Sequence, residues 1–163
     1  MSIRNCGELG INLQKIVSRL LANDNLVKLL YYQNKDPLSG EAFSVEQKQK
    51  EIFEKLIRII PRITEDDTNQ SVVVIYTKGG RKNLNNSEFR TIEFVVDVWV
   101  PLDQWIIKDS NLRPFAILGE IQESLEGKTI NGLGKIQGGD FELSRLTDKN
   151  SIYTQTFSIV EYD

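Results

Sequence analysis

The sequence predicts an α+β protein with a four-stranded, mainly antiparallel sheet, helices packed on one face of that sheet, and further helices at the N-terminus. Residues 89–100 alternate between apolar and more polar side chains, and apolar residues recur at helical spacing before residue 58. Two pairs of strand-like segments flank one helical segment. This order, three helices, two strands, a helix and two strands, is typical of an α+β domain. The length of 163 residues favours one domain, with a helical part at 1–63 and a sheet-plus-helix part at 70–163.

The strand predicted at 89–100 is the clearest element and ends at Pro101. Successive side chains of a strand point to opposite faces of the sheet. One face is then wholly apolar, with Ile92, Phe94, Val96, Val98 and Val100. The opposite face is mixed, with Thr91, Glu93, Val95, Asp97 and Trp99. We therefore expect one face to pack on the core and the other to face water or a partner.

Three helices are expected before the sheet. Residues 8–22 carry apolar side chains at three- and four-residue spacing, and a short helix at 26–32 follows, capped by Asp24 or Asn25. Residues 33–40 form a turn-rich loop. Ser44 and Gln47 match a capping box, which predicts a third helix to about Arg58 that buries four apolar residues, Ile52, Phe53, Leu56 and Ile57. Pro61 would end it, and Ile59, Ile60 and Ile63 would connect it to the sheet.

The rest of the sheet is predicted from β-branched and alternating segments. A strand is expected at 71–77, followed by a polar arm at 78–88 that is long for a hairpin loop. After Pro101 and a loop to 111, a helix is expected from Pro114, with one apolar stripe and Gly127 as its C′ residue. A glycine-rich stretch at 128–139 leads to strands at about 139–147 and 152–162, joined by a turn at 148–151.

Composition excludes several functional classes. The chain has no histidine and a single cysteine, Cys6, which rules out His-dependent triads, cysteine zinc sites and an intramolecular disulfide. The net charge of −3 gives no general attraction to nucleic acid or to anionic membranes. The first residues carry no apolar signal-peptide core, and no apolar run approaches a membrane span. We expect a protein made in the cytoplasm that has no membrane partner.

Three patterns suggest chemistry only weakly. Glu93 and Asp97 share a strand face, but at about 3.3 Å per residue they would lie ~13 Å apart, too far to share a metal ion unaided. Gly127-Lys128-Thr129 matches the end of a phosphate-binding loop but follows a helix and lacks the upstream glycine. The glycines at 132, 134, 138 and 139 indicate a turn more than an anion cradle. No catalytic residue, metal ligand or cofactor is predicted.

The better candidates are interaction residues. Lys78, Arg81 and Lys82 form a basic cluster around Gly79 and Gly80, and Asn85 lies further along the same arm. A solvated hairpin tip, a protein interface and nucleic-acid contact all remain open for this cluster. Trp99 lies on the mixed strand face, where it would serve as an interface anchor or as part of a satellite core.

The order of elements resembles the tail-terminator and tail-completion proteins of tailed bacteriophages over about three quarters of the chain. The resemblance is carried by fold patterns, which are the N-terminal helices through residues 26–32, Asp36-Pro37-Leu38, the strand 92–100 with Pro101, Asn111-Leu112-Arg113-Pro114, Asn131-Gly132-Leu133-Gly134, and the closing strand to Tyr162. Residues 33–63 depart from the family pattern, with an extra loop and helix.

The resemblance implies a structural virion protein that forms a homohexameric ring. Such a ring caps the tail tube and joins it to the connector or neck proteins, with a sheath protein as a further candidate partner. DNA would pass through its lumen without specific binding, and Glu93 and Asp97 would face that lumen. The expected location is the tail or neck of the virion, assembled in the host cytoplasm. The alternatives are a small metal-dependent DNA-processing enzyme using Glu93 and Asp97, and an adaptor of a phage-like contractile injection or secretion machine.

Overall fold

The computed structural model describes residues 6–60, 69–82, 85, 89–130 and 134–162. Pro61 and Ile63, predicted to end a helix and to connect it to the sheet, lie outside these ranges, as do 83–84, 86–88 and 131–133. No helix in the described ranges is long and apolar enough to cross a membrane.

The prediction of a four-stranded, mainly antiparallel sheet is wrong, although the protein is α+β. The main sheet has five strands in the order β1-β2-β3-β7-β6. They are β1 (Ile57–Arg58), β2 (Val72–Lys82), β3 (Phe89–Pro101), β7 (Asn150–Tyr162) and β6 (Ile136–Leu146). The sheet is mixed because β1 runs parallel to β2, whereas the other neighbours are antiparallel. A second sheet pairs β4 (Ile106–Ile107) with β5 (Asn111–Leu112).

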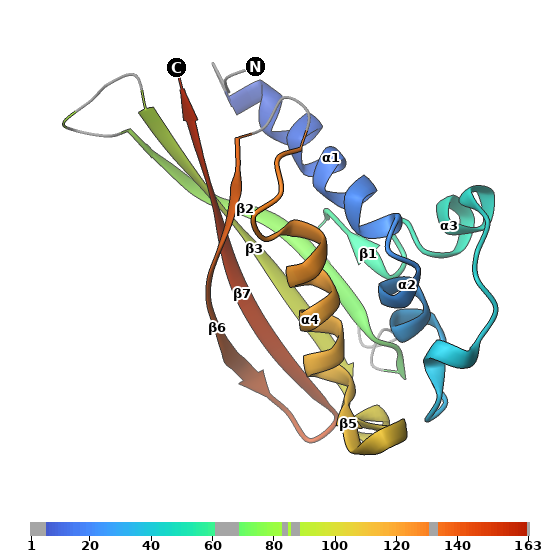
Figure 1. Ribbon diagram of the computed structural model, residues 1–163. Coiled ribbons are helices and arrows are strands. Elements are labelled where there is room, and N and C mark those ends of the chain that lie inside the picture. The colour runs from blue at the N-terminus through green and yellow to red at the C-terminus, as the bar shows by residue number, and fades with distance from the viewer. Residues whose placement is uncertain (1–5, 61–68, 83–84, 86–88, 131–133, 163) are drawn as a thin grey trace.

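The predicted core face of β3 is confirmed. Its five apolar side chains, Ile92, Phe94, Val96, Val98 and Val100, are all buried. In Figure 1, α1 (Leu9–Leu21) and α4 (Arg113–Leu125) lie in front of the main sheet, on the side that this face packs against. The helices therefore cover one face of the sheet, and the side chains at the odd-numbered positions of β3 point to the other.

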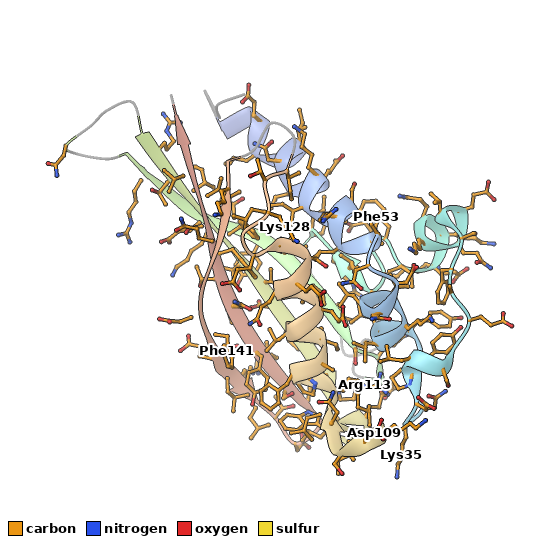
Figure 2. All side chains as sticks on the ribbon, viewed as in Figure 1. Lys35, Phe53, Asp109, Arg113, Lys128 and Phe141 are labelled. Carbon is orange, nitrogen blue, oxygen red and sulfur yellow. The ribbon has the colours of Figure 1, made fainter. Side chains whose placement is uncertain are left out.

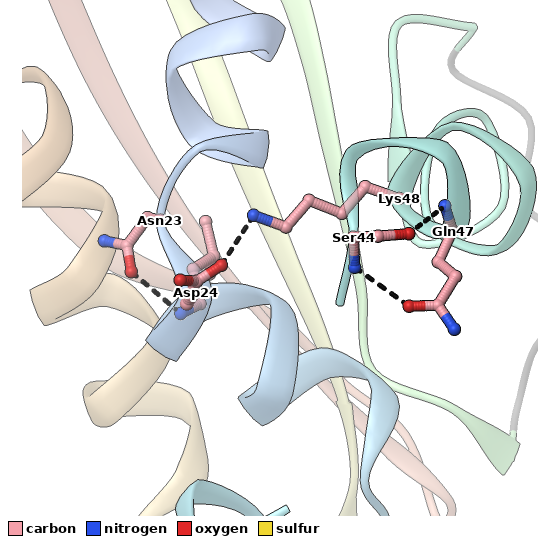
Figure 3. Close-up of polar contacts among 6 residues, drawn as sticks. Asn23, Asp24, Ser44, Gln47 and Lys48 are labelled. Carbon is pink, nitrogen blue, oxygen red and sulfur yellow. Dashed lines mark hydrogen bonds and ion pairs between the residues drawn. The ribbon is translucent and has the colours of Figure 1, made fainter. Parts of the chain in front are cut away.

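Side-chain capping fixes the first turns of the second and third helices (Figure 3). Asn23, and not Asp24 or Asn25 as predicted, caps α2 (Asp24–Tyr31) by accepting a hydrogen bond from the Leu26 amide. The predicted capping box is confirmed. In α3 (Val45–Glu51) the Ser44 hydroxyl accepts from the Gln47 amide, and the Gln47 side chain accepts from the Ser44 amide.

The third helix is shorter than predicted. It ends at Glu51, and its predicted last residues instead form a turn and strand β1. Glu54 has a φ of 60°, a left-handed conformation that no α-helix can contain. Ile52, Leu56 and Ile57 are buried as expected, while Phe53 is only partly buried. Three of the four apolar residues are thus buried as predicted, but they lie in a turn and a strand and not in a helix.

The first part of the arm predicted at 78–88, residues 78–82, is strand. Residues 78–82 belong to β2 and pair with the start of β3, past an irregularity in register between Thr77 and Gly79. The predicted C′ role of Gly127 after α4 is confirmed by its φ of 71°. The Gly127-Lys128-Thr129 triplet therefore follows a helix, as its context in the sequence indicated.

Candidate interaction surfaces

The candidate surface predicted from the sequence is the face of the main sheet opposite the helices, here called the outer face. On this face, the odd-numbered residues of β3 lie between paired residues of β2 and β7. Asp97 lies between Val74 of β2 and Thr154 of β7, and Glu93 lies between Gly79 and Ser158. Glu93, Asp97 and Thr154 are each partly exposed. The outer face therefore carries polar side chains at Glu93, Asp97 and Thr154, and buried apolar side chains at Val74 and Val95.

Asp97 is fixed by its neighbours on this face. The Thr154 hydroxyl donates to its carboxylate at 2.6 Å, and Ser144 Oγ of β6 lies 2.8 Å from the same hydroxyl. The pKa of Tyr76 is raised, first by burial and then by the charge of Asp97 and a hydrogen bond to it. Both causes linked to Asp97 favour the neutral phenol, because an ionised phenolate would be repelled by the carboxylate. Asp97 is thus part of a hydrogen-bonded cluster that spans four strands.

Asp97→Asn should lower the raised pKa of Tyr76 without removing the whole shift, because burial, the largest single cause, remains. The phenol stays protonated in the folded protein at a pH where it ionises in the unfolded chain. The contribution of Tyr76 to stability is therefore complete below that unfolded pKa and is lost as pH rises through the folded pKa. Ultraviolet titration of phenolate absorbance measures this, with Tyr76→Phe identifying the signal.

Glu93→Gln is the matched control for that titration, because Glu93 is the next carboxylate on the outer face and is not a cause of the Tyr76 shift. The titration curve of Tyr76 should be unchanged in this variant. An unchanged curve in Asp97→Asn as well would contradict the coupling between Tyr76 and Asp97.

The structure does not bring Glu93 and Asp97 together as a metal site. They are four residues apart on one strand and have different cross-strand partners. Within the described ranges, no group of three or more His, Cys, Asp and Glu side chains is placed to hold a metal ion. Their prediction as lumen-facing residues remains a prediction.

Trp99 is partly buried and packs against the hydrophobic core, with Val72 and Ile152 as its cross-strand neighbours. Its indole N–H is buried and has no hydrogen-bond partner among the described residues. A buried unsatisfied donor costs about 1–3 kcal/mol. These observations agree with the satellite-core alternative, and the interface role predicted for Trp99 stays a prediction.

The predicted basic cluster lies at the end of β2. Lys78, Gly79, Gly80 and Arg81 are exposed, and Lys82 is the last residue of the strand. A Cβ atom at Gly80 would lie 2.7 Å from Cδ1 of Ile92 of β3, so a side chain there would require the end of the Ile92 side chain to shift. Asn85, predicted to share this interface, lies beyond the strand and is also exposed. The cluster is presented by a sheet and not by a flexible arm.

Two hollows lie on the helical side, between α1 and the C-terminal end of α4. One, about 470 Å³, is bordered by cationic Arg19 and Lys128 and by anionic Asp24, Glu120 and Glu123. At its wall the Asn23 amide donates to the Glu120 carboxylate and to the Ser124 hydroxyl, both at 2.9 Å. The hollow has charges of both signs, and hydrogen bonds at its wall join Asn23, before α2, to Glu120 and Ser124 of α4.

Sequence reasoning missed Arg113, the most buried charged residue in the described ranges, with 1% of its surface exposed. Its guanidinium donates to the carbonyls of Leu29, Tyr32, Asn34 and Gln104. Figure 2 shows it at the start of α4, facing α2. Burial lowers its pKa, and the carbonyl oxygens at the C-terminal end of α2 compensate its charge. Its position at the first turn of a predicted helix gave no signal of burial.

The fold and these surfaces define an α+β protein with a helical layer on one side of a mixed sheet and a hydrogen-bonded polar cluster on the other. A family model named YomW matches residues 23–159, and the chain belongs to the YomW family. That name is of the type given to proteins of the Bacillus phage SPbeta, so the protein is associated with a phage. No curated protein matches the chain.

Proposed function

We propose that this protein is a structural, non-enzymatic component of a phage tail, a terminator or neck protein that forms a ring between tail tube and head connector. The observation that supports this most is the outer face of the main sheet. It carries a polar cluster of Asp97, Thr154 and Ser144 that is cross-linked by hydrogen bonds, and α1 and α4 pack on the opposite face. Membership of a phage-associated family gives that surface its context.

The chemistry of the outer face suits a lumen through which DNA passes. Glu93 and Asp97 place carboxylates on it, and carboxylates repel the phosphate backbone. The Thr154 hydroxyl holds Asp97 in place, so the negative charge is fixed. The net charge of −3 for the whole chain further disfavours tight DNA binding. The partners in this proposal are other copies of the chain, the tail tube protein and the connector or neck proteins, with the sheath as a further candidate.

Binding to purified tail tubes tests the proposal. The tubes are prepared from a phage variant that lacks the gene, mixed with the full-length protein, and imaged by negative-stain electron microscopy. We expect a ring at one end of each tube and, in extracts that also contain filled heads, restored joining of heads to tails. Tubes whose ends stay bare, together with a deletion phage that still assembles infectious virions, would contradict the proposed function.

A further inference from the structure

The main sheet has two edges that carry opposite charge. On one side β6 is outermost and pairs only with β7 within the described part of the chain. On the other side β1 pairs with just two residues of β2, Val73 and Val74. From Ile75 to Lys82, the edge of β2 that faces away from β3 has no strand partner among the described residues. Open edges carry backbone donors and acceptors that can pair with another strand.

The β6 edge is acidic and apolar. Asp140 and Glu142 are exposed on it, with Arg145 further along. Phe141, Leu143 and Leu146 of the same strand are 51%, 47% and 60% exposed. Figure 2 labels Phe141 on this edge strand.

The apolar residues of β6 continue onto the helical side of the sheet. Leu143 pairs with Tyr153, whose ring packs edge-to-face on Phe115 of α4 at 5.2 Å. Phe115 is itself 41% exposed. Contiguous exposed apolar side chains beside an open strand are a feature of interaction sites.

The β2 edge is basic. Lys78 and Arg81 are exposed, and the strand contains no acidic residue. Ile60, which follows β1 along the same side of the sheet, is 59% exposed. The edge therefore offers positive charge with an apolar side chain nearby, which complements the acidic, apolar edge of β6.

We propose that the β6 edge of one copy of this chain pairs with the β2 edge of a second copy. Both β2 and β7 are antiparallel to β3, and β6 is antiparallel to β7, so β6 runs antiparallel to β2. Joining the two edges between copies in the same orientation extends the sheet with an antiparallel ladder. Asp140 and Glu142 then face the strand that carries Lys78 and Arg81.

Repulsion between like charges disfavours the two symmetric pairings, β6 with β6 and β2 with β2. Two β6 edges would bring Asp140 and Glu142 of both copies together, and two β2 edges would do the same for Lys78 and Arg81. The favoured contact is therefore head-to-tail, with two different surfaces. Contacts of this type close into rings or extend into filaments, whereas a symmetric edge pair would stop at a dimer. The inference rests on the proposed ring and identifies the surfaces that join its subunits.

Charge reversal tests the contact by sedimentation velocity of the full-length chain over a concentration series. D140K/E142K makes both edges basic, and K78E/R81E makes both edges acidic. Each variant alone should form the wild-type oligomer more weakly. The apparent Kd should rise about tenfold or more, which is about 1.4 kcal/mol of association free energy. A mixture of the two variants should recover it, because every contact again joins opposite charges. The variant with all four changes should recover it alone.

Two control variants change the same charge elsewhere on the surface. E41K/E46K and K35E/K50E alter exposed residues outside both edges, and they should sediment like wild type. Circular dichroism checks that every variant is folded. A wild-type chain that stays monomeric, edge variants that associate normally, or a mixture that fails to recover would each overturn the proposed contact.

The readouts separate this inference from the proposed function. Protein that caps tail tubes while its edge variants still form rings would refute the contact and leave the function in place. Protein that forms rings through these edges but leaves tube ends bare would refute the function and leave the contact in place.

Discussion

Replacing Arg113 with methionine is expected to lower the free energy of unfolding by about 3–5 kcal/mol. The guanidinium donates to Tyr32, Asn34 and Gln104 at 2.8, 2.6 and 3.0 Å, and also to Leu29. Methionine is of similar length but donates nothing, so it would leave these carbonyls without the donor they have now. Since Arg113 joins α4 to the end of α2 and to the loop after β3, its loss weakens three segments at once.

The measurement is chemical denaturation followed by circular dichroism, with two comparison variants. Arg19→Met removes an exposed arginine with one long bond, 3.4 Å, to the Ser124 carbonyl, and it should cost about 0.5 kcal/mol or less. Arg113→Lys keeps the charge but lacks the planar fork of donors, so its loss should be intermediate. An Arg113→Met variant as stable as Arg19→Met would refute the role assigned to this buried arginine.

Arg113 also shows where sequence reasoning ends. An arginine in the first turn of a helix is ordinarily a surface residue, and a positive charge there is mildly unfavourable to the helix dipole. Its burial depends on carbonyls about eighty residues earlier in the chain, including those of Leu29 and Tyr32. No local pattern encodes that contact. The sequence could predict the helix, but not the residue that anchors it.

Elements with strong local periodicity were predictable. The core face of β3 follows from strict alternation, and the Ser44 capping box follows from two residues three apart. The predicted length of the third helix was wrong because four apolar residues fit either a helical stripe or a buried turn. They are Ile52, Phe53, Leu56 and Ile57. The left-handed φ of 60° at Glu54 excludes a helix through this residue. A glutamate in the sequence does not predict that conformation. The two-residue, parallel strand β1 is too short for any periodicity to reveal.

The candidate surfaces divide in the same way. The composition of the outer face could be deduced from alternation along β3. Glu93 and Asp97 are partly exposed there, whereas Val95 is buried and Trp99 packs against the core. Strand β2 runs past its predicted end at residue 77, because pairing with β3 extends it through Lys78, Gly79 and Gly80, which are poor strand formers. The exposure of Phe141 and Leu143 was also hidden, since it depends on β6 lying at the edge of the sheet, beside α4 and not beneath it.

Phe94→Ala should lower the free energy of unfolding by about 3–5 kcal/mol, because it leaves a cavity where two strands meet in the core. Phe94 and its cross-strand partner Phe157 are 1% and 0% exposed, and their rings stack with centroids 5.3 Å apart. At about 2–4 °C per kcal/mol for a chain of this size, the melting temperature should fall by roughly 10 °C.

Glu93→Ala, one residue away on the outer face, should change stability by no more than about 0.5 kcal/mol, since Glu93 is partly exposed.

Phe157→Ala should destabilise the protein about as much as Phe94→Ala. The double variant should lose less stability than the sum of the two single variants, by about 0.5–1.5 kcal/mol, because each single change already removes the stacking of the pair. Thermal and chemical denaturation measure all four variants. Equal losses for Phe94→Ala and Glu93→Ala would mean that the two faces of β3 do not divide between core and surface. The proposed lumen depends on that division, because Glu93 and Asp97 can face DNA only if their side of β3 is not part of the core.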